Sequence, residues 1–177
     1  MTIEYQINEQ DFLDFQLFTA SQSKRINKKK NSGWILLTFG SIIISVYFYL
    51  NQDIALTIYF GVVALVCGLF YPRYFKWRYK KHYKTYIKEN YSKRFGLTEY
   101  LEINNDSIYS KDKTGEGKIN ISEIEQIDET NKHFFLKIST GQSFLIPKYR
   151  LNNSDELRTV FQSLGLSVNN MLSWEWK

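Results

Sequence analysis

Two long apolar runs, separated by three polar residues, constrain the fold of this chain more than any other feature. They are residues 33–50 (GWILLTFGSIIISVYFYL) and 54–71 (IALTIYFGVVALVCGLFY), with Asn-Gln-Asp between them. Each run has 18 residues without a charge, and as an α-helix it would be roughly 27 Å long, close to the thickness of a bilayer's hydrocarbon core. A chain of 177 residues has too little other sequence to bury both helices in a soluble core. The sequence therefore predicts a transmembrane helical hairpin over residues 33–71.

Basic residues flank this hairpin on both sides, whereas Asp53 is the only charged residue in the loop between the runs. Lys and Arg close to the ends of transmembrane helices favour the cytoplasmic side, so both chain termini are expected in the cytoplasm. Aromatic and basic side chains at these positions are expected to contact lipid headgroups. The residues expected at the membrane surface are Lys28, Lys29, Lys30, Trp34, Arg73, Lys76, Trp77, Arg78, Lys80 and Lys81.

The positive charge of the chain is concentrated around the hairpin. Residues 15–88 contain 12 basic residues and one acidic residue, a net charge of +11, whereas the rest of the chain has a net charge of −6. The formal charge of +5 therefore reflects the membrane flanks and not a nucleic-acid-binding surface. The predicted partners are the lipid bilayer and its anionic headgroups, and no nucleic acid is expected.

Residues 1–32 are predicted to form a short strand followed by an amphipathic helix. Residues 2–7 alternate between polar and apolar, and Asn8 can cap a helix in which Phe12, Phe15 and Phe18 recur at helical spacing. This helix has room to run on through the basic cluster into the first apolar run. Two interpretations remain open: the helix packs on the rest of the protein, or it binds a partner.

Residues 72–95 interleave basic and aromatic residues. Six apolar side chains recur every fourth residue, which in a helix places them on one face. They are Phe75, Tyr79, Tyr83, Ile87, Tyr91 and Phe95. Such a helix is expected either to lie at the lipid headgroups or to form a stalk packed on the soluble part. RNA binding is disfavoured, since the adjoining apolar run already accounts for the charge.

Residues 96–177 show the two-residue period of strands. Five strands are expected, the third slipping by one residue at Glu123, which suggests a bulge or a short loop. The segment DKTGEG (112–117) is expected to be a turn, and a helix is expected from Asn153 or Ser154 to Gly165. The five expected strands are residues 97–103, 107–110, 118–128, 133–139 and 142–146. A curved antiparallel sheet closed by the C-terminal helix is the expected arrangement.

No catalytic or cofactor-binding motif is present. Cys67 is the only cysteine and lies in the second apolar run, and neither His82 nor His133 has a second ligand at a metal-binding spacing. Glycine-rich phosphate loops and nucleophile elbows are missing. Neither apolar run contains an ionisable Asp, Glu, Lys, Arg or His, so an ion pathway through the hairpin is disfavoured. The chain is not expected to be an enzyme or to hold a cofactor or metal.

Asp11-Phe12-Leu13 and Phe144-Leu145-Ile146-Pro147, together with the order of predicted elements, resemble the YcxB-like family of bacterial membrane proteins. The resemblance covers nearly the whole chain. It implies a C-terminal pleckstrin-homology-like domain on the cytoplasmic side of the bacterial cell membrane, and it supplies no catalytic residues. The tail with Trp174 and Trp176 departs from the family pattern: exposed tryptophans would favour a membrane surface or partner, and buried ones would close the barrel.

The predicted fold class is an α+β membrane protein, a transmembrane hairpin (33–50 and 54–71) plus a small antiparallel β-barrel or curved sheet closed by a helix. Residues 1–32, 33–71, 72–95 and 96–177 are its expected segments. The expected function is that of a membrane-anchored cytoplasmic module that binds a protein or an anionic headgroup. The alternative is a small regulatory or immunity-type protein whose hairpin acts on a membrane partner or a second copy. Gly61, Ala64 and Gly68 offer small surfaces for such contacts, or simply let the two helices of the hairpin meet.

Overall fold

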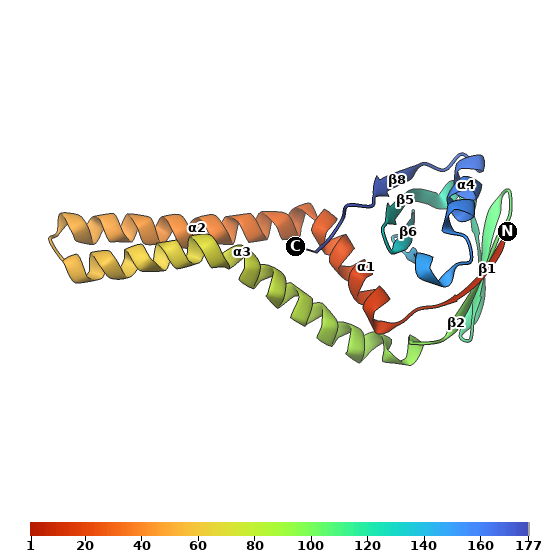
Figure 1. The fold of residues 1–177 in the computed structure, drawn as a ribbon, viewed down its shortest axis with the longest axis horizontal. Helices are drawn as coiled ribbons and strands as arrows, with labels where there is room; N and C mark the ends of the chain where they lie inside the picture. The colour runs from red at the N-terminus through yellow and green to blue at the C-terminus, as the bar shows by residue number, and fades with distance from the viewer. Residues whose placement is uncertain (177) are drawn as a thin grey trace. The chain divides into compact units, whose positions relative to one another are not determined.

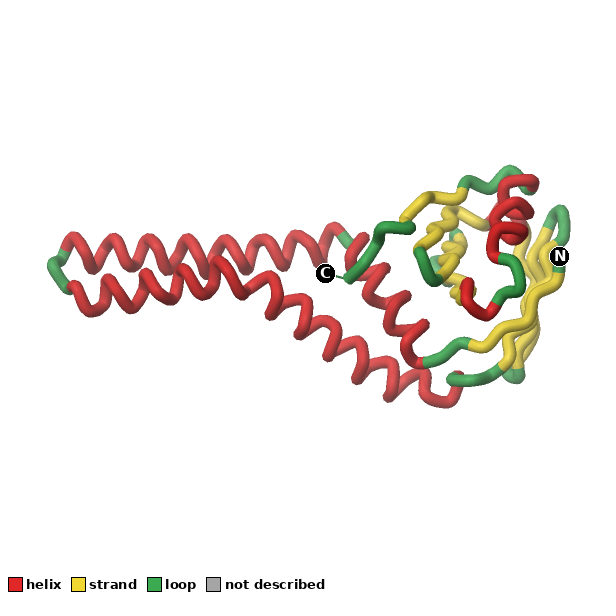
Figure 2. Tube along the Cα trace, in the orientation of Figure 1, coloured by secondary structure: helices red, strands yellow, loops and turns green. Residues whose placement is uncertain are grey.

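A computed structural model describes residues 1–176 and divides the chain into two compact units (Figure 1). The β unit comprises Met1–Gln16 and Lys84–Glu175, and the helical unit comprises Leu17–Tyr83 with Trp176. Helices α1 (Glu9–Gln22) and α3 (Ile54–Tyr91) contribute residues to both units. All strands belong to the β unit, as the yellow segments of Figure 2 show.

The helical unit is an antiparallel hairpin of α2 (Lys24–Leu50) and the first part of α3. The Ser23 hydroxyl accepts a hydrogen bond from the backbone N–H of Ile26 at 3.3 Å and so caps α2. Helix α1 therefore ends before the basic cluster instead of running on into the first apolar run. Both α2 and α3 are long and apolar enough to cross a membrane, and only 6% of the most apolar window of each is buried.

Contacts along the hairpin fix how α2 and α3 pair. The Ser45 hydroxyl donates to the backbone carbonyl of Thr57 at 2.8 Å, and the rings of Phe48 and Phe60 stack with centroids 5.7 Å apart. Helix α3 continues through Pro72, which has no N–H to donate to the carbonyl four residues earlier, that of Gly68. The indole N–H of Trp34 donates to this carbonyl instead, at 3.0 Å. Figure 1 shows α3 bending in this region.

The β unit contains two four-stranded sheets. Sheet A has the order β1-β2-β3-β4 and is antiparallel throughout. Sheet B has the order β7-β6-β5-β8, in which β8 runs parallel to β5. The strands of sheet A are β1 (Thr2–Gln6), β2 (Thr98–Ile103), β3 (Ser107–Asp112) and β4 (Gly115–Asn120). Those of sheet B are β5 (Ile124–Thr130), β6 (His133–Ile138), β7 (Ser143–Pro147) and β8 (Val168–Met171).

Three expectations about these strands are wrong. Residues 118–128 do not form one strand: the 3-10 turn η2 (Ile121–Glu123), at the slip expected near Glu123, moves the chain from sheet A to sheet B. Residues 115–117 lie within β4, so the turn expected over 112–117 is confined to two residues. A single antiparallel sheet is replaced by two sheets, and the tail supplies β8, the one parallel partner among the described strands.

The apolar core of the β unit fills the inner faces of both sheets. Ile108, Phe134 and Ile146 are fully buried. Helix α4 (Ser154–Ser163) is capped by Asn153, whose side chain accepts from two backbone N–H groups, and it buries Phe161 5.9 Å from the ring of Phe134. Short 3-10 turns, η1 (Ser92–Arg94) and η3 (Lys148–Arg150), follow α3 and β7. The C-terminal helix was thus predicted correctly, with its cap.

Candidate functional sites

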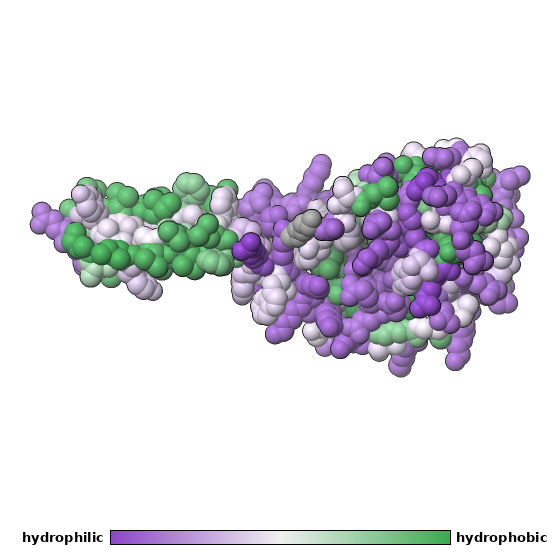
Figure 3. All heavy atoms as spheres, in the orientation of Figure 1, coloured by the Kyte–Doolittle hydropathy of each residue, from purple (hydrophilic) through white to green (hydrophobic). Residues whose placement is uncertain are grey.

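The apolar side chains of the hairpin form the largest apolar surface of the helical unit. Leu36, Leu50 and Leu69 have 73%, 74% and 63% of their surface exposed. On the face of the hairpin that Figure 3 draws, green hydrophobic side chains predominate and paler ones lie between them. Soluble proteins rarely expose contiguous apolar patches of more than a few hundred Å², because such a surface binds other apolar groups. This surface therefore has the composition of one that is covered by a non-aqueous medium or by a partner.

The residues predicted to meet lipid headgroups lie at one end of this hairpin. Lys28, Lys29, Lys30 and Trp34 are on α2, and the other six are on α3. The Trp34–Gly68 hydrogen bond and the close approach of Gly33 to the Tyr71 ring bring the two groups to the same end. Among residues 17–83 there are ten basic side chains and a single acid, Asp53, which lies in the loop at the opposite end. We use the name basic border for the residues predicted to meet lipid headgroups, which are eight of these basic residues together with Trp34 and Trp77.

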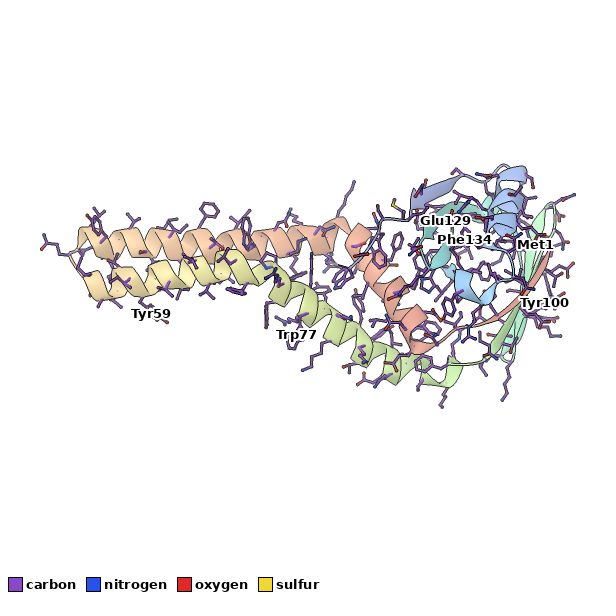
Figure 4. All side chains as sticks on the ribbon, in the orientation of Figure 1. Met1, Tyr59, Trp77, Tyr100, Glu129 and Phe134 are labelled. Atoms are coloured by element: carbon purple, nitrogen blue, oxygen red, sulfur yellow. The ribbon has the colours of Figure 1, made fainter. Side chains whose placement is uncertain are left out.

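The two tryptophans of the basic border differ. Trp77 is 58% exposed, projects from α3 in Figure 4, and has the Lys81 ammonium 5.3 Å from its ring centroid. The Tyr74 ring lies 6.1 Å from Trp77. This exposed aromatic and cationic group has the chemistry of a membrane interface. Trp34 is half-buried, and its indole N–H is already used inside the hairpin.

The other aromatic residues of this part of α3 stack along one face. The Phe75 and Tyr79 rings are 4.4 Å apart, Tyr83 follows at 6.1 Å, and Phe75 is buried. At the same end of the hairpin, the Trp176 indole N–H donates to the backbone carbonyl of Lys76 at 3.3 Å. Trp174 and Trp176 are both half-buried, so neither of the two simple expectations for the tail describes them.

Three glycines each face the other helix of the same hairpin: Gly33 lies on α2, and Gly61 and Gly68 lie on α3. A Cβ at Gly61 would meet the Ser45 hydroxyl at 3.6 Å, and one at Gly68 would meet a Thr38 methyl at 3.6 Å. A Cβ at Gly33 would collide with the Tyr71 hydroxyl. Close approach of α2 and α3 therefore requires glycine at Gly33, whereas a Cβ at Gly61 or Gly68 would make an ordinary contact with the other helix. All three glycines face the other helix of the same hairpin, which is the simpler of the two interpretations.

A buried polar cluster joins three distant parts of the β unit. The Nε2 atom of His133 lies 2.8 Å from a carboxylate oxygen of Asp11, and the Tyr149 hydroxyl donates to the same carboxylate at 2.8 Å. Asp11 also accepts from the backbone N–H of Asn8 at 2.9 Å. Burial raises the pKa of Asp11, but the hydrogen bonds from His133, Asn8 and Tyr149 outweigh burial and leave that pKa below its ordinary value. The sequence marked Asp11 only as part of the Asp11-Phe12-Leu13 motif, because its side-chain partners His133 and Tyr149 lie more than 120 residues away.

A second polar cluster holds α4 on sheet B. The Glu129 side chain is 4% exposed and accepts from the Lys148 ammonium at 2.5 Å and from the Arg158 guanidinium at 2.6 Å. Burial raises the pKa of Glu129, and the hydrogen bonds from Arg158 and Lys148 more than offset it, so the pKa lies below its ordinary value. This cluster links β5, η3 and α4, and every charged group in it has a partner.

The β unit also contains an open cavity of about 710 Å³. Its apolar walls come from α1, sheet A and β7, and they include Phe12, Phe15 and Phe144. Its polar lining includes Arg94, Glu99 and Asp112. Polar, charged and glycine residues make up most of the rest of its lining, and its volume is in the range of ligand-binding sites. Sequence reasoning missed it, because no motif marks it.

The charged groups of the cavity are close together. One terminal nitrogen of Arg94 lies 3.5 Å from both Glu99 and Asp112. Burial raises the pKa of Glu99, whereas the Thr114 hydroxyl and the backbone of the β3–β4 turn lower the pKa of Asp112. The Tyr5 hydroxyl donates to Glu99 at 3.2 Å. Within residues 1–176 no group of three His, Cys, Asp or Glu side chains is arranged to hold a metal ion.

These features define an α+β protein with an exposed apolar helical hairpin, a basic border and a two-sheet β unit. A family model described as YcxB-like protein matches residues 103–161, from the end of β2 into α4. Residues 103–161 are therefore similar to YcxB-like proteins, and the resemblance predicted from the sequence is confirmed over these residues, not over nearly the whole chain. Neither a curated protein nor a solved structure matches the chain.

Proposed function

We propose that the protein is a membrane-anchored binding module whose hairpin crosses the bilayer. The observation that carries the proposal is the exposure of two 18-residue apolar windows, only 6% of each of which is buried. The core helices of a soluble protein would have most of that surface covered by the rest of the chain. Lipid covers it at no cost, since the hydrocarbon core is itself apolar.

The distribution of charge supports an orientation with both termini in the cytoplasm of a bacterial cell. Lys and Arg are concentrated at the end of the hairpin where the chain enters α2 and continues beyond the apolar part of α3. The loop at residues 51–53 has Asp53 as its only charged residue. In this arrangement the basic border faces the anionic headgroups of the inner leaflet, each cation contributing about 1 kcal/mol near the surface. The exposed Trp77 beside Lys81 fits the same interface.

The β unit is then a cytoplasmic module of the pleckstrin-homology-like kind, which recognises a partner and catalyses no reaction. Two four-stranded sheets followed by α4, and a match to the YcxB-like family, support this assignment. The alternative, in which the hairpin itself acts on a membrane partner, has less support. Gly33, Gly61 and Gly68 already face the other helix of the same hairpin and are not free for a partner.

Alkaline carbonate extraction of membranes tests the anchor. The full chain is expected in the pellet. Ile43 is 68% exposed near the middle of the first apolar run, so Ile43→Asp is expected to lower the membrane-inserted fraction markedly, since a central Asp costs roughly 2.5–3.5 kcal/mol on insertion. Leu172→Asp is the matched control, because Leu172 is 41% exposed in the β unit and its change should leave insertion unaltered. Equal extraction of both variants, or wild type in the supernatant, would refute the proposed anchor.

A further inference from the structure

We propose that the cavity of the β unit is a binding groove for an extended peptide segment that carries a basic side chain, added as a strand to the free edge of β4. This inference rests on the proposed function as a binding module and names its partner class. Three observations carry it: two strand edges without strand partners, two glycines on the inward face of β4, and an excess of negative charge on that face.

Strands β4 and β7 both line the cavity, and each has only one neighbour. Within residues 1–176, β4 pairs with β3 alone, and β7 pairs with β6 alone. The second backbone edge of each strand therefore has N–H and C=O groups with no strand partner. Free edges of this kind pair readily with an added strand, and an extended peptide is the ligand that uses them. The cavity lies beside both edges, so it can receive the side chains of such a peptide.

The inward face of β4 is bare where it meets the cavity. Gly115 and Gly117 are exposed, a Cβ added at Gly115 would meet nothing within 4 Å, and one at Gly117 would meet only the Ser110 hydroxyl at 3.8 Å. Glu116, between the two glycines, points to the other face of the sheet. It pairs there with Lys111, whose ammonium lies 3.9 Å from the Glu116 carboxylate. Glycines in a strand permit close approach by another backbone. The open space above this strand is therefore suited to a second strand and its side chains.

The charges of the inward face favour a basic ligand. The register that pairs Tyr100 with Lys111 brings Glu99 beside Asp112, so two carboxylates lie next to each other. Their side chains are only 19% and 17% exposed, and they share the single cation of Arg94 at 3.5 Å, the outer limit of a hydrogen bond. Adjacent like charges on a sheet destabilise it, so a second cation is attracted to this position. On the inward face these three groups have a net charge of −1, because Lys111, Glu116 and Lys118, which also border the cavity, alternate onto the other face of the sheet. A Lys or Arg of the ligand would neutralise that charge.

The aromatic walls complete the match. Phe15 and Phe144 are half-buried at the cavity, although they are large apolar side chains of a folded domain. A peptide with alternating residues presents every second side chain to one side. A segment that places an apolar residue on either side of a Lys or Arg, all on one face, would contact these rings and the carboxylate pair together.

The test uses the full chain in detergent micelles and a defined peptide pool. The pool is the heptapeptide Thr-Val-Thr-Lys-Thr-Val-Thr, blocked at both ends, with the two Val positions varied among apolar and aromatic residues, and a matched pool has Glu in place of Lys. The Lys pool is expected to bind about tenfold more tightly than the Glu pool, because attraction is replaced by repulsion. Binding is expected to protect the β4 amides of residues 115–120 from hydrogen exchange, as strand addition requires.

Two kinds of variant localise the binding. Glu99→Gln keeps an acceptor for Tyr5 but removes one charge, and it should weaken Lys-pool binding about fivefold. Glu125→Gln removes a carboxylate that is paired with Lys137 outside the cavity lining, and it should leave binding unchanged. Gly117→Val, with Gly115→Val as the second version, fills the groove and should abolish binding while the thermal unfolding of the β unit stays unchanged.

Equal binding of the two pools, no binding of the Lys pool at millimolar concentration, binding that survives both valine variants, or protection confined to strands other than β4 would each overturn the proposal. Displacement of the Lys pool by phosphatidylglycerol added at detergent-compatible concentration would identify a lipid headgroup as the occupant and would also overturn it. Carbonate extraction is independent of these measurements, so a failure here is distinguishable from a failure of the membrane anchor.

Discussion

Trp34→Phe tests whether the indole of Trp34 replaces the backbone donor that Pro72 lacks. In an unbroken helix the N–H of residue 72 would donate to the carbonyl of Gly68, and proline has no such hydrogen. The Trp34 indole N–H lies 3.0 Å from this carbonyl and comes from the other helix of the hairpin. Phenylalanine retains most of the ring but has no donor, so the variant leaves the Gly68 carbonyl unpaired in apolar surroundings.

The expected loss is about 1–2 kcal/mol in the free energy of unfolding. Leaving a buried acceptor without its partner costs about 1–3 kcal/mol in soluble proteins, whereas hydrogen bonds between helices in a membrane average about 0.6 kcal/mol. Pro72→Ala restores an N–H at the position that bonds the Gly68 carbonyl. In that background the same Trp34→Phe change should cost about 0.5 kcal/mol or less, giving a coupling of about 1 kcal/mol between the two positions.

The assay is a dodecyl sulfate titration of the chain in dodecyl maltoside micelles, with energy transfer between dyes on the basic ends of α2 and α3 reporting helix separation. Trp77→Phe is the matched control, because Trp77 is 58% exposed on the same hairpin, and its change should alter the free energy by less than about 0.5 kcal/mol. An equal cost of Trp34→Phe with and without Pro72→Ala would refute the reasoning, since the indole would then stabilise the hairpin only by packing.

Three further predictions concern the β unit. The pKa of Asp11 is lowered in the folded state, so its stabilising contribution is present above the pKa of the unfolded group, near 3.9, and is lost as the pH falls through the folded value. In chemical denaturation, the difference in free energy of unfolding between wild type and Asp11→Asn should therefore shrink below about pH 4. A difference independent of pH would contradict this. Glu129→Gln leaves two cations without their carboxylate, and it should lower the free energy of unfolding in urea by about 2–4 kcal/mol. Glu125→Gln is the surface control and should lower it by less than about 0.5 kcal/mol. Equal losses would show that the buried cluster adds no stability. Gly96 has a φ of 73° with open space around it, so Gly96→Ala should cost about 1–2 kcal/mol through backbone strain alone, and an unchanged melting temperature would contradict that account.

The helical hairpin and the C-terminal helix were predictable because their signals are local. An uncharged run of 18 residues has few structures open to it, and Asn153 before Asp155 and Glu156 is a helix start that needs no knowledge of the rest of the chain. The helical period was equally legible over residues 75–83, where Phe75, Tyr79 and Tyr83 do stack along one face. Phe95, expected on the same helix, lies beyond its end at Tyr91.

The strand boundaries were less predictable, because alternation continues across a change of sheet. Ile119, Ile121 and Ile124 keep nearly the same spacing on both sides of η2, so the slip at Glu123 indicates a break but not that β4 and β5 belong to different sheets. The glycines of residues 115–117 resemble a turn, yet they lie in β4, where a free edge tolerates missing side chains.

The sites of the β unit could not be read from the sequence, since they depend on long-range contacts. Asp11 and His133 are 122 residues apart in the chain and meet only when α1 packs beside β6. The cavity combines residues of α1, sheet A and the β6–β7 turn, and Glu99 approaches Asp112 only through the β2–β3 register. The basic border is different, because its members are grouped by sequence and the hairpin brings its two halves to one end.

The side of the membrane on which the loop at residues 51–53 lies tests the central claim most directly. In a Cys67→Ala background, which removes the only native thiol, single cysteines replace Asp53 in the loop or Glu125 in the β unit. A membrane-impermeant maleimide is added to intact cells, whose outer membrane, if present, has been permeabilised first. The reagent should label position 53 at once, and position 125 only after the cytoplasmic membrane is permeabilised. Labelling of position 53 only after permeabilisation, or of position 125 in intact cells, would contradict a hairpin that crosses the bilayer with both termini inside.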